Sequence, residues 1–163
     1  MQLHLRSHQW EARVPDWIAA AIAGFVAGAV VMVMELLWSI VVLDISPWAA
    51  PHLVAAIVMG PSALESTAFS VSVVTVALLT HYVLGAIFGV ILASIIAPFH
   101  FDSSILMIAS IGAMFGLVLY IFNFYGMVHI FPWFAGMRNG VTLTSHLLFG
   151  ITAAIMYRQL ERY

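Results

Sequence analysis

Long apolar runs separated by short polar stretches form the pattern of this chain. Such runs lie near Trp17–Leu43, Val73–Ala97, Ser104–Phe131 and Asn139–Tyr157. A helix needs about 20 apolar residues to cross a hydrocarbon core about 30 Å thick, so each run is long enough to span it. The pattern therefore predicts an all-α fold, an integral membrane four-helix bundle.

A shorter apolar stretch connects the first two runs. It extends from Ser46 to Ser66 and contains Pro47, Pro51 and Pro61. Its apolar centre of about a dozen residues is too short to cross a bilayer. We expect a short helix that is interfacial or re-entrant and lies on the outer side, where irregular backbone has to be covered by protein or wetted.

These elements predict a domain organisation of two transmembrane hairpins. The expected parts are an N-terminal segment at 1–16, a first hairpin at 17–97 with the prolyl outer helix at 46–66, a loop at 98–103, a second hairpin at 104–157 and a tail at 158–163. Four of the five arginines flank the two termini, and only Arg138 lies in a loop on the opposite side. The positive-inside rule then predicts that both termini and the 98–103 loop are cytoplasmic.

Composition narrows the class of protein further. The chain has 163 residues, of which 64% are hydrophobic and 7% are charged, and its net charge is -2. A soluble domain is about a quarter charged, so this composition excludes soluble and disordered classes. With five arginines and no lysine, the chain lacks the basic surface of a nucleic-acid-binding protein. The absence of cysteine excludes a disulfide framework and a thiolate metal site.

Glycine and polar positions recur between the two hairpins. Gly24 and Gly28 in AGFVAG lie 88 positions before Gly112 and Gly116 in IGAMFG, and the same offset aligns Glu35 with Asn123. An offset of 65 aligns His81, Gly85 and Gly89 with His146, Gly150 and Ala154. The chain is therefore predicted to contain two parallel-repeat hairpins related by pseudo-two-fold symmetry about the membrane normal.

The aligned residues lie on one face of each expected helix, because side chains four, seven or eleven positions apart share a face. Small residues allow helices to approach closely in lipid. The predicted packing residues are Gly24, Gly28, Gly85, Gly89, Gly112, Gly116, Gly150 and Ala154.

Four polar residues are expected to form one layer. Each lies about eight residues from the outer end of its apolar run: Glu35, Asn123, His81 and His146. Eight residues correspond to about 12 Å along a helix. An ionisable group inside a membrane marks a functional site by default, and the expected partners of Glu35 are His81 and His146.

Several interpretations of this polar layer stay open. His81 and His146 are candidate axial ligands of haem b, or the four residues are ligands of one transition metal ion. Glu35 alone suits a small proton or cation transporter. A purely structural accessory subunit would use the same layer to fix helix packing. His52 and His129, by contrast, are expected to be solvated near the outer interface.

The pattern of an AGxxAG helix, a prolyl loop, and HxxxGxxxG and HxxxGxxxA helices resembles a group of small bacterial four-span membrane proteins. The resemblance covers Ala19 to Tyr157 and implies the four-helix fold and a bacterial inner membrane. It implies no substrate, cofactor or catalytic residue.

The sequence therefore predicts a non-enzymatic membrane subunit or binding protein. Its expected partners are the lipid bilayer and other membrane subunits or a second copy of itself, and no nucleic acid.

Overall fold

The structure is a computed structural model that describes residues 13–99, 101 and 104–161, and these residues form helices and connecting turns without strands. Four helical segments are long and apolar enough to span a membrane: α1 (Trp17–Val41), α3 (Val71–Phe99), Ile105–His129 and α5 (Gly140–Leu160). The prediction of four long apolar helices is confirmed.

The third long segment changes its helical type along its length. It begins as α4 (Ile105–Ile121) and continues as a π-helical turn, η2 (Phe122–Gly126). Two 3-10 helices follow, η3 (Met127–His129) and η4 (Pro132–Met137). The end of this segment is therefore irregular where the sequence suggested one continuous apolar run.

Side-chain caps explain where three of the long helices begin. The Asp16 carboxylate accepts hydrogen bonds from the amides of Ile18 and Ala19, at 3.1 and 3.0 Å. Ser104 caps α4, and Asn139 caps α5 by accepting from the amide of Thr142 at 3.0 Å. Each cap satisfies an amide that has no partner within its own helix.

The prolyl connection forms a short helix, α2 (Ala49–Met59), followed by the 3-10 helix η1 (Pro61–Leu64). Gly60 separates the two helices with a φ of 83°, a backbone conformation that residues other than glycine rarely adopt. The connection packs mainly against α3.

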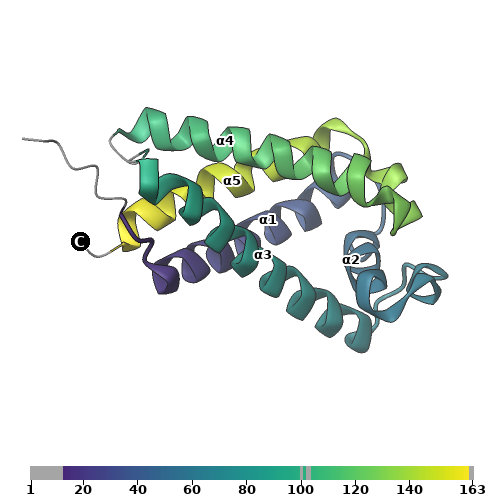
Figure 1. Cartoon of the computed structure of the whole chain (residues 1–163). Coiled ribbons are helices and arrows are strands. Elements are labelled where there is room, and N and C mark those ends of the chain that lie inside the picture. The colour runs from purple at the N-terminus through teal and green to yellow at the C-terminus, as the bar shows by residue number, and fades with distance from the viewer. Residues whose placement is uncertain (1–12, 100, 102–103, 162–163) are drawn as a thin grey trace, which may run out of the picture.

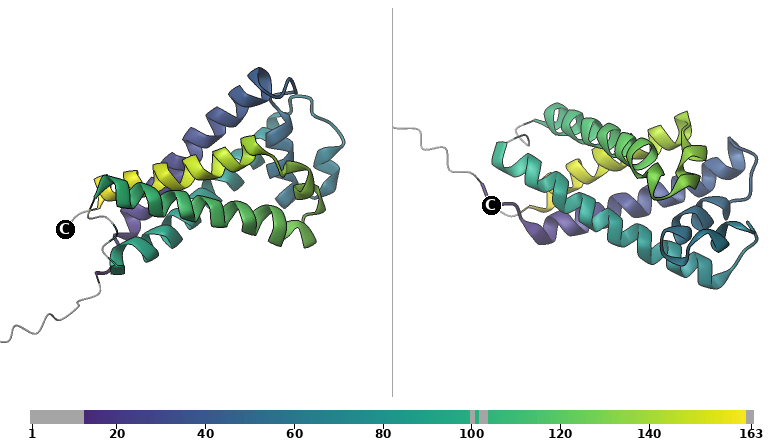
Figure 2. Two further views of the ribbon diagram at one scale, coloured as in Figure 1. Left: turned by 90° about the horizontal axis from the view of Figure 1, so that it is seen from above. Right: turned by 45° about the vertical axis from the view of Figure 1, so that its right-hand side comes forward.

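The helices are arranged around α1 and α5. Helix α1 packs along both α3 and α5, and α5 packs along α4, whereas α3 and α4 make little contact (Figure 1). The start of α1 and the end of α5 lie at one end of the bundle, which we call the paired end, where Arg13 forms an ion pair with Glu161. The opposite end carries α2 and η4 and is called the loop end (Figure 2).

Glycines bring the helices into backbone contact. A Cβ on Gly85 would lie 2.8 Å from the carbonyl oxygen of Gly24, so α1 and α3 cross in direct backbone contact. A Cβ on Gly150 would lie 2.9 Å from the carbonyl carbon of Gly112, and α4 meets α5 in the same way. The contacting pairs occupy positions that the offsets of 88 and 65 align. The repeat and its symmetry axis stay predictions.

The core at the paired end is built from small side chains. Ala20, Ala27 and Ala154 are fully buried there together with the larger Leu92 and Ile96. Toward the loop end, α1 and α3 diverge and α2 lies beside them (Figures 1 and 2). Tight packing at one end therefore coexists with wider helix spacing at the other.

Substituting Gly150 tests this close approach. Gly150→Ala places a methyl group against the backbone of α4, so we expect the free energy of unfolding to fall by on the order of 2 kcal/mol. Gly136→Ala is the control, because no atom lies within 4 Å of a Cβ built there. Denaturant titration of helicity in detergent measures both variants, and equal stabilities would contradict the backbone contact.

Candidate functional site: a cavity at the loop end

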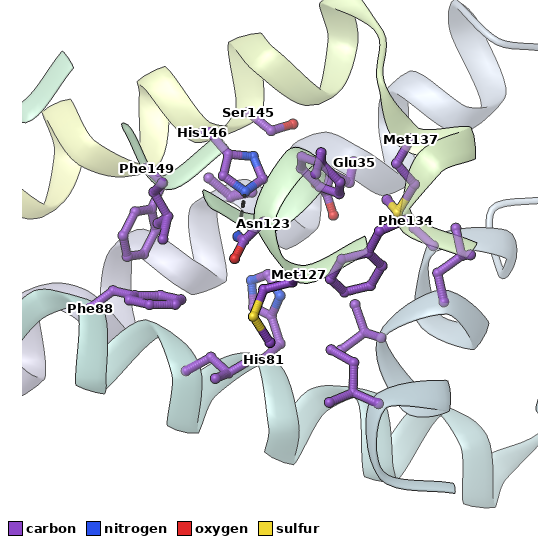
Figure 3. A pocket seen from close by; sticks show the side chains of 18 of the residues that line it. Glu35, His81, Phe88, Asn123, Met127, Phe134, Met137, Ser145, His146 and Phe149 are labelled. Carbon is purple, nitrogen blue, oxygen red and sulfur yellow. Dashed lines mark hydrogen bonds between the residues drawn. The ribbon is translucent and has the colours of Figure 1, made fainter. Parts of the chain in front are cut away.

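All four residues of the predicted polar layer line one cavity of about 250 Å³. Glu35 comes from α1, His81 from α3, Asn123 from the π turn η2 and His146 from α5 (Figure 3). Each of these side chains is half-buried. The structure therefore places residues from all four long segments around one space, together with apolar residues of α2 and η4.

His146 is held by two hydrogen bonds. Its Nδ1 lies 2.9 Å from the carbonyl oxygen of Thr142, and its Nε2 lies 3.2 Å from Nδ2 of Asn123. A carbonyl only accepts, so Nδ1 carries the proton and Nε2 accepts from the amide of Asn123. Both ring nitrogens of this neutral histidine are therefore occupied.

His81 has the opposite arrangement. Its Nε2 lies 2.9 Å from the carbonyl oxygen of Gly28 and must donate the hydrogen bond. Nδ1 of the neutral ring is then an acceptor. The bond ties α3 to α1 one turn from the contact between Gly24 and Gly85, so His81 contributes to helix packing and also lines the cavity.

Glu35 lines the same cavity as the two histidines, but no hydrogen bond or ion pair joins it to either ring in the part of the chain that the structure describes. Its expected pairing with His81 and His146 is therefore absent, because the nitrogens that could donate to it bind other partners. The polar neighbour of the carboxyl is the hydroxyl of Ser145.

Ser145 is a site residue that the sequence reasoning missed. Its side chain is fully buried and lines the cavity, and its hydroxyl lies beside the carboxyl of Glu35 without reaching hydrogen-bond distance of any described group. Most buried polar groups are hydrogen-bonded, and the carboxyl of Glu35 is the acceptor nearest to this hydroxyl. The only hint in the sequence was that this polar residue directly precedes His146.

The π turn η2 determines where Asn123 points. A π turn breaks the regular hydrogen-bond ladder of a helix and often occurs at functional sites. Arg138 donates from Nε to the carbonyl oxygen of Phe124 at 2.7 Å, and its guanidinium lies 4.4 Å from the centre of the Tyr125 ring. Arg138 therefore fixes this turn from outside the cavity, a role that its position in a loop did not indicate.

The remaining wall of the cavity is aromatic and sulfur-containing. The rings of Phe88 and Phe149 meet edge to face at 6.5 Å, and those of Phe124 and Phe134 lie 5.5 Å apart. Met127 contributes a thioether to the same wall (Figure 3). The cavity thus combines polarizable apolar walls with a few polar groups, which is the usual composition of a ligand site.

The cavity offers limited support for the cofactor predictions. Within the described residues, no group of three His, Asp or Glu side chains is placed to hold a metal ion. The volume of about 250 Å³ is below the range of about 300–1,000 Å³ typical for drug-sized ligands, and a porphyrin exceeds that ligand size. The Nε2 atoms of His81 and His146 are also both engaged in hydrogen bonds.

The two other histidines that the structure describes lie outside the cavity wall. His129 is exposed, as expected for the interface. His52 is buried, with 4% exposure, and its ring contacts the carbonyl oxygens of Ala63 and Ala68. It anchors the connection after α2, so the expectation that His52 is solvated is wrong.

Comparison of the chain with protein-family models, with curated proteins and with solved structures finds no match.

The two imidazole rings are predicted to adopt opposite neutral tautomers. Nitrogen-15 NMR of histidine-labelled protein in lipid nanodiscs should show a protonated Nδ1 for His146 and a protonated Nε2 for His81. The variants His146→Gln and His81→Gln assign the signals, and the exposed His129→Gln is the control that should leave both unchanged. The same tautomer in both rings would contradict the hydrogen bonds described above.

Proposed function

We propose that the protein is a non-enzymatic integral membrane binding protein whose loop-end cavity holds a small molecule with a flat apolar body and a polar end. The observation that carries the proposal is the convergence of Glu35, His81, Asn123 and His146 on one largely apolar cavity. A few polar groups in an apolar pocket are what orient a bound molecule.

A purely structural role accounts for only part of the polar layer. The bonds of His146 to Asn123 and of His81 to Gly28 fix helix packing. Such contacts contribute about 0.6 kcal/mol each in membrane proteins. Packing does not explain why the carboxyl of Glu35 lines a cavity with only the hydroxyl of Ser145 as its polar neighbour. A ligand would supply further partners for this carboxyl.

The size of the cavity indicates the size of its occupant. A dry apolar cavity of about 150 Å³ is known to bind benzene. A volume of about 250 Å³ therefore accommodates one ring with a short polar substituent. The rings of Phe88 and Phe149, which meet edge to face at the cavity wall, offer aromatic contacts to a body of this kind.

Filling the cavity is expected to remove the bound molecule. Leu84→Trp adds a large ring at the cavity wall, whereas Val83→Trp adds the same ring at the neighbouring position of α3, which is 58% exposed and lies outside the wall. Extraction of protein purified in mild detergent, followed by mass spectrometry, should find a small molecule at about one per chain in the wild type and in Val83→Trp. Equal occupancy in Leu84→Trp, or none in the wild type, would contradict the proposal.

Elemental analysis tests the alternative predictions of haem b or a metal ion. Protein purified without chelator is expected to contain iron, zinc and copper well below one atom per chain, because the Nε2 atoms of His81 and His146 are engaged. A metal at about one per chain that disappears in both His81→Ala and His146→Ala would favour the cofactor prediction instead.

A further inference from the structure

The polar groups left unpaired around the cavity are mainly hydrogen-bond acceptors. His81 offers Nδ1, because its Nε2 donates to Gly28. Asn123 offers its carbonyl oxygen, because its amide nitrogen donates to His146. Glu35 offers a carboxyl group that no ion pair neutralises in the described residues. The donors on the wall are the hydroxyl of Ser145 and the second amide hydrogen of Asn123.

The charge of the cavity wall has one sign. The lining residues include one carboxyl group and no arginine, and the chain contains no lysine. A buried carboxyl group stays neutral unless a positive group lies beside its ionised form. The protein itself supplies no such group at the cavity wall, so a cationic occupant would be the charge that favours the ionised form of Glu35.

The apolar walls also suit a cation. Four aromatic rings belong to the wall: Phe88, Phe124, Phe134 and Phe149. The face of an aromatic ring attracts a desolvated cation with a free energy of up to about 2 kcal/mol. Met127 and Met137 add polarizable sulfur.

We propose that the cavity binds a small organic cation, a protonated primary amine on a ring-sized apolar body. Its ammonium group donates to the carboxylate of Glu35, to Nδ1 of His81 and to the side-chain oxygen of Asn123, and its ring lies among the phenylalanines. This proposal rests on the proposed function and names the ligand class for the same cavity.

A second, smaller pocket adjoins this position. It has a volume of about 10 Å³, is shared by Glu35 and His81, and is otherwise lined by residues of α1 and α2 such as Met32 and Pro51. That volume is close to the minimum that holds one water molecule. One water there can hydrate the carboxylate when the cation is absent.

Other ligand classes fit the wall less well. A quinone or another carbonyl compound needs donors, and the wall offers few of them beyond Ser145 and one amide hydrogen of Asn123. An anion would meet the carboxyl of Glu35 without a balancing positive side chain.

The test compares three probes that share a phenyl ring and differ in charge: benzylammonium, benzyl alcohol and benzoate. Calorimetric titration of the full chain, freed of any co-purified molecule by dialysis and placed in lipid nanodiscs at neutral pH, with empty nanodiscs subtracted, measures their affinities. We expect saturable binding of benzylammonium at one per chain, at least about tenfold tighter than benzyl alcohol, and no binding of benzoate.

Variants assign the charge preference to Glu35. Glu35→Gln should weaken benzylammonium binding about tenfold or more and leave benzyl alcohol nearly unchanged, while Glu35→Asp should retain part of the preference. Asp44→Asn is the matched control, because it neutralises an exposed carboxylate outside the cavity and asparagine also tolerates the positive φ of 51° found there. Unchanged helicity and elution confirm that each variant folds.

The outcomes separate this inference from the proposed function. If the three probes bind equally and Leu84→Trp abolishes all of them, the cavity is a binding site but not one for cations. If benzylammonium binds equally well to wild type, Glu35→Gln and Leu84→Trp, it binds elsewhere and the inference is wrong. If no probe binds, the cation inference is also wrong, and the co-purified molecule alone decides the proposed function.

Discussion

Backbone contact between glycines is the constraint on which the rest of this structure depends. The four long helical segments are apolar enough to span a membrane. In lipid no hydrophobic force favours helix association, so close van der Waals approach has to hold the helices together. Gly24 of α1 meets Gly85 of α3, and Gly112 of α4 meets Gly150 of α5. Because α1 and α3 cross there at an angle, tight packing toward the paired end is accompanied by separation toward the loop end. The cavity lies in that separation.

The polar layer divides its residues between two tasks. His146 with Asn123, and His81 with Gly28, hold each long helix to its neighbour. Glu35 and Ser145 take no part in these bonds, although both lie at the cavity wall. His81 belongs to both groups, since one ring nitrogen serves packing and the other is left for an occupant. The same layer thus joins the helices and leaves polar groups on the cavity wall.

Much of the fold could be predicted from the sequence, and less of the site. Apolar length determines which segments span the membrane, and glycine spacing indicates which faces approach one another. The common depth of Glu35, His81, Asn123 and His146 follows from counting residues along regular helices, and these residues do line one cavity. Which atoms pair could not be predicted, because it depends on helix rotation and on the π turn that carries Asn123. The role of Arg138 depends on the same irregular turn.

The separation of the chain into two tightly packed hairpins has a consequence for assembly. Helices α1 and α3 form one hairpin and α4 and α5 the other, and the two join mainly where α1 lies along α5. Neither hairpin alone contains the cavity, because its wall takes residues from both. Any molecule that occupies the cavity therefore binds only the state in which the two hairpins are docked. By mass action, its binding stabilises this docked state. The fraction of protein with its two hairpins docked then rises with the occupancy of the cavity.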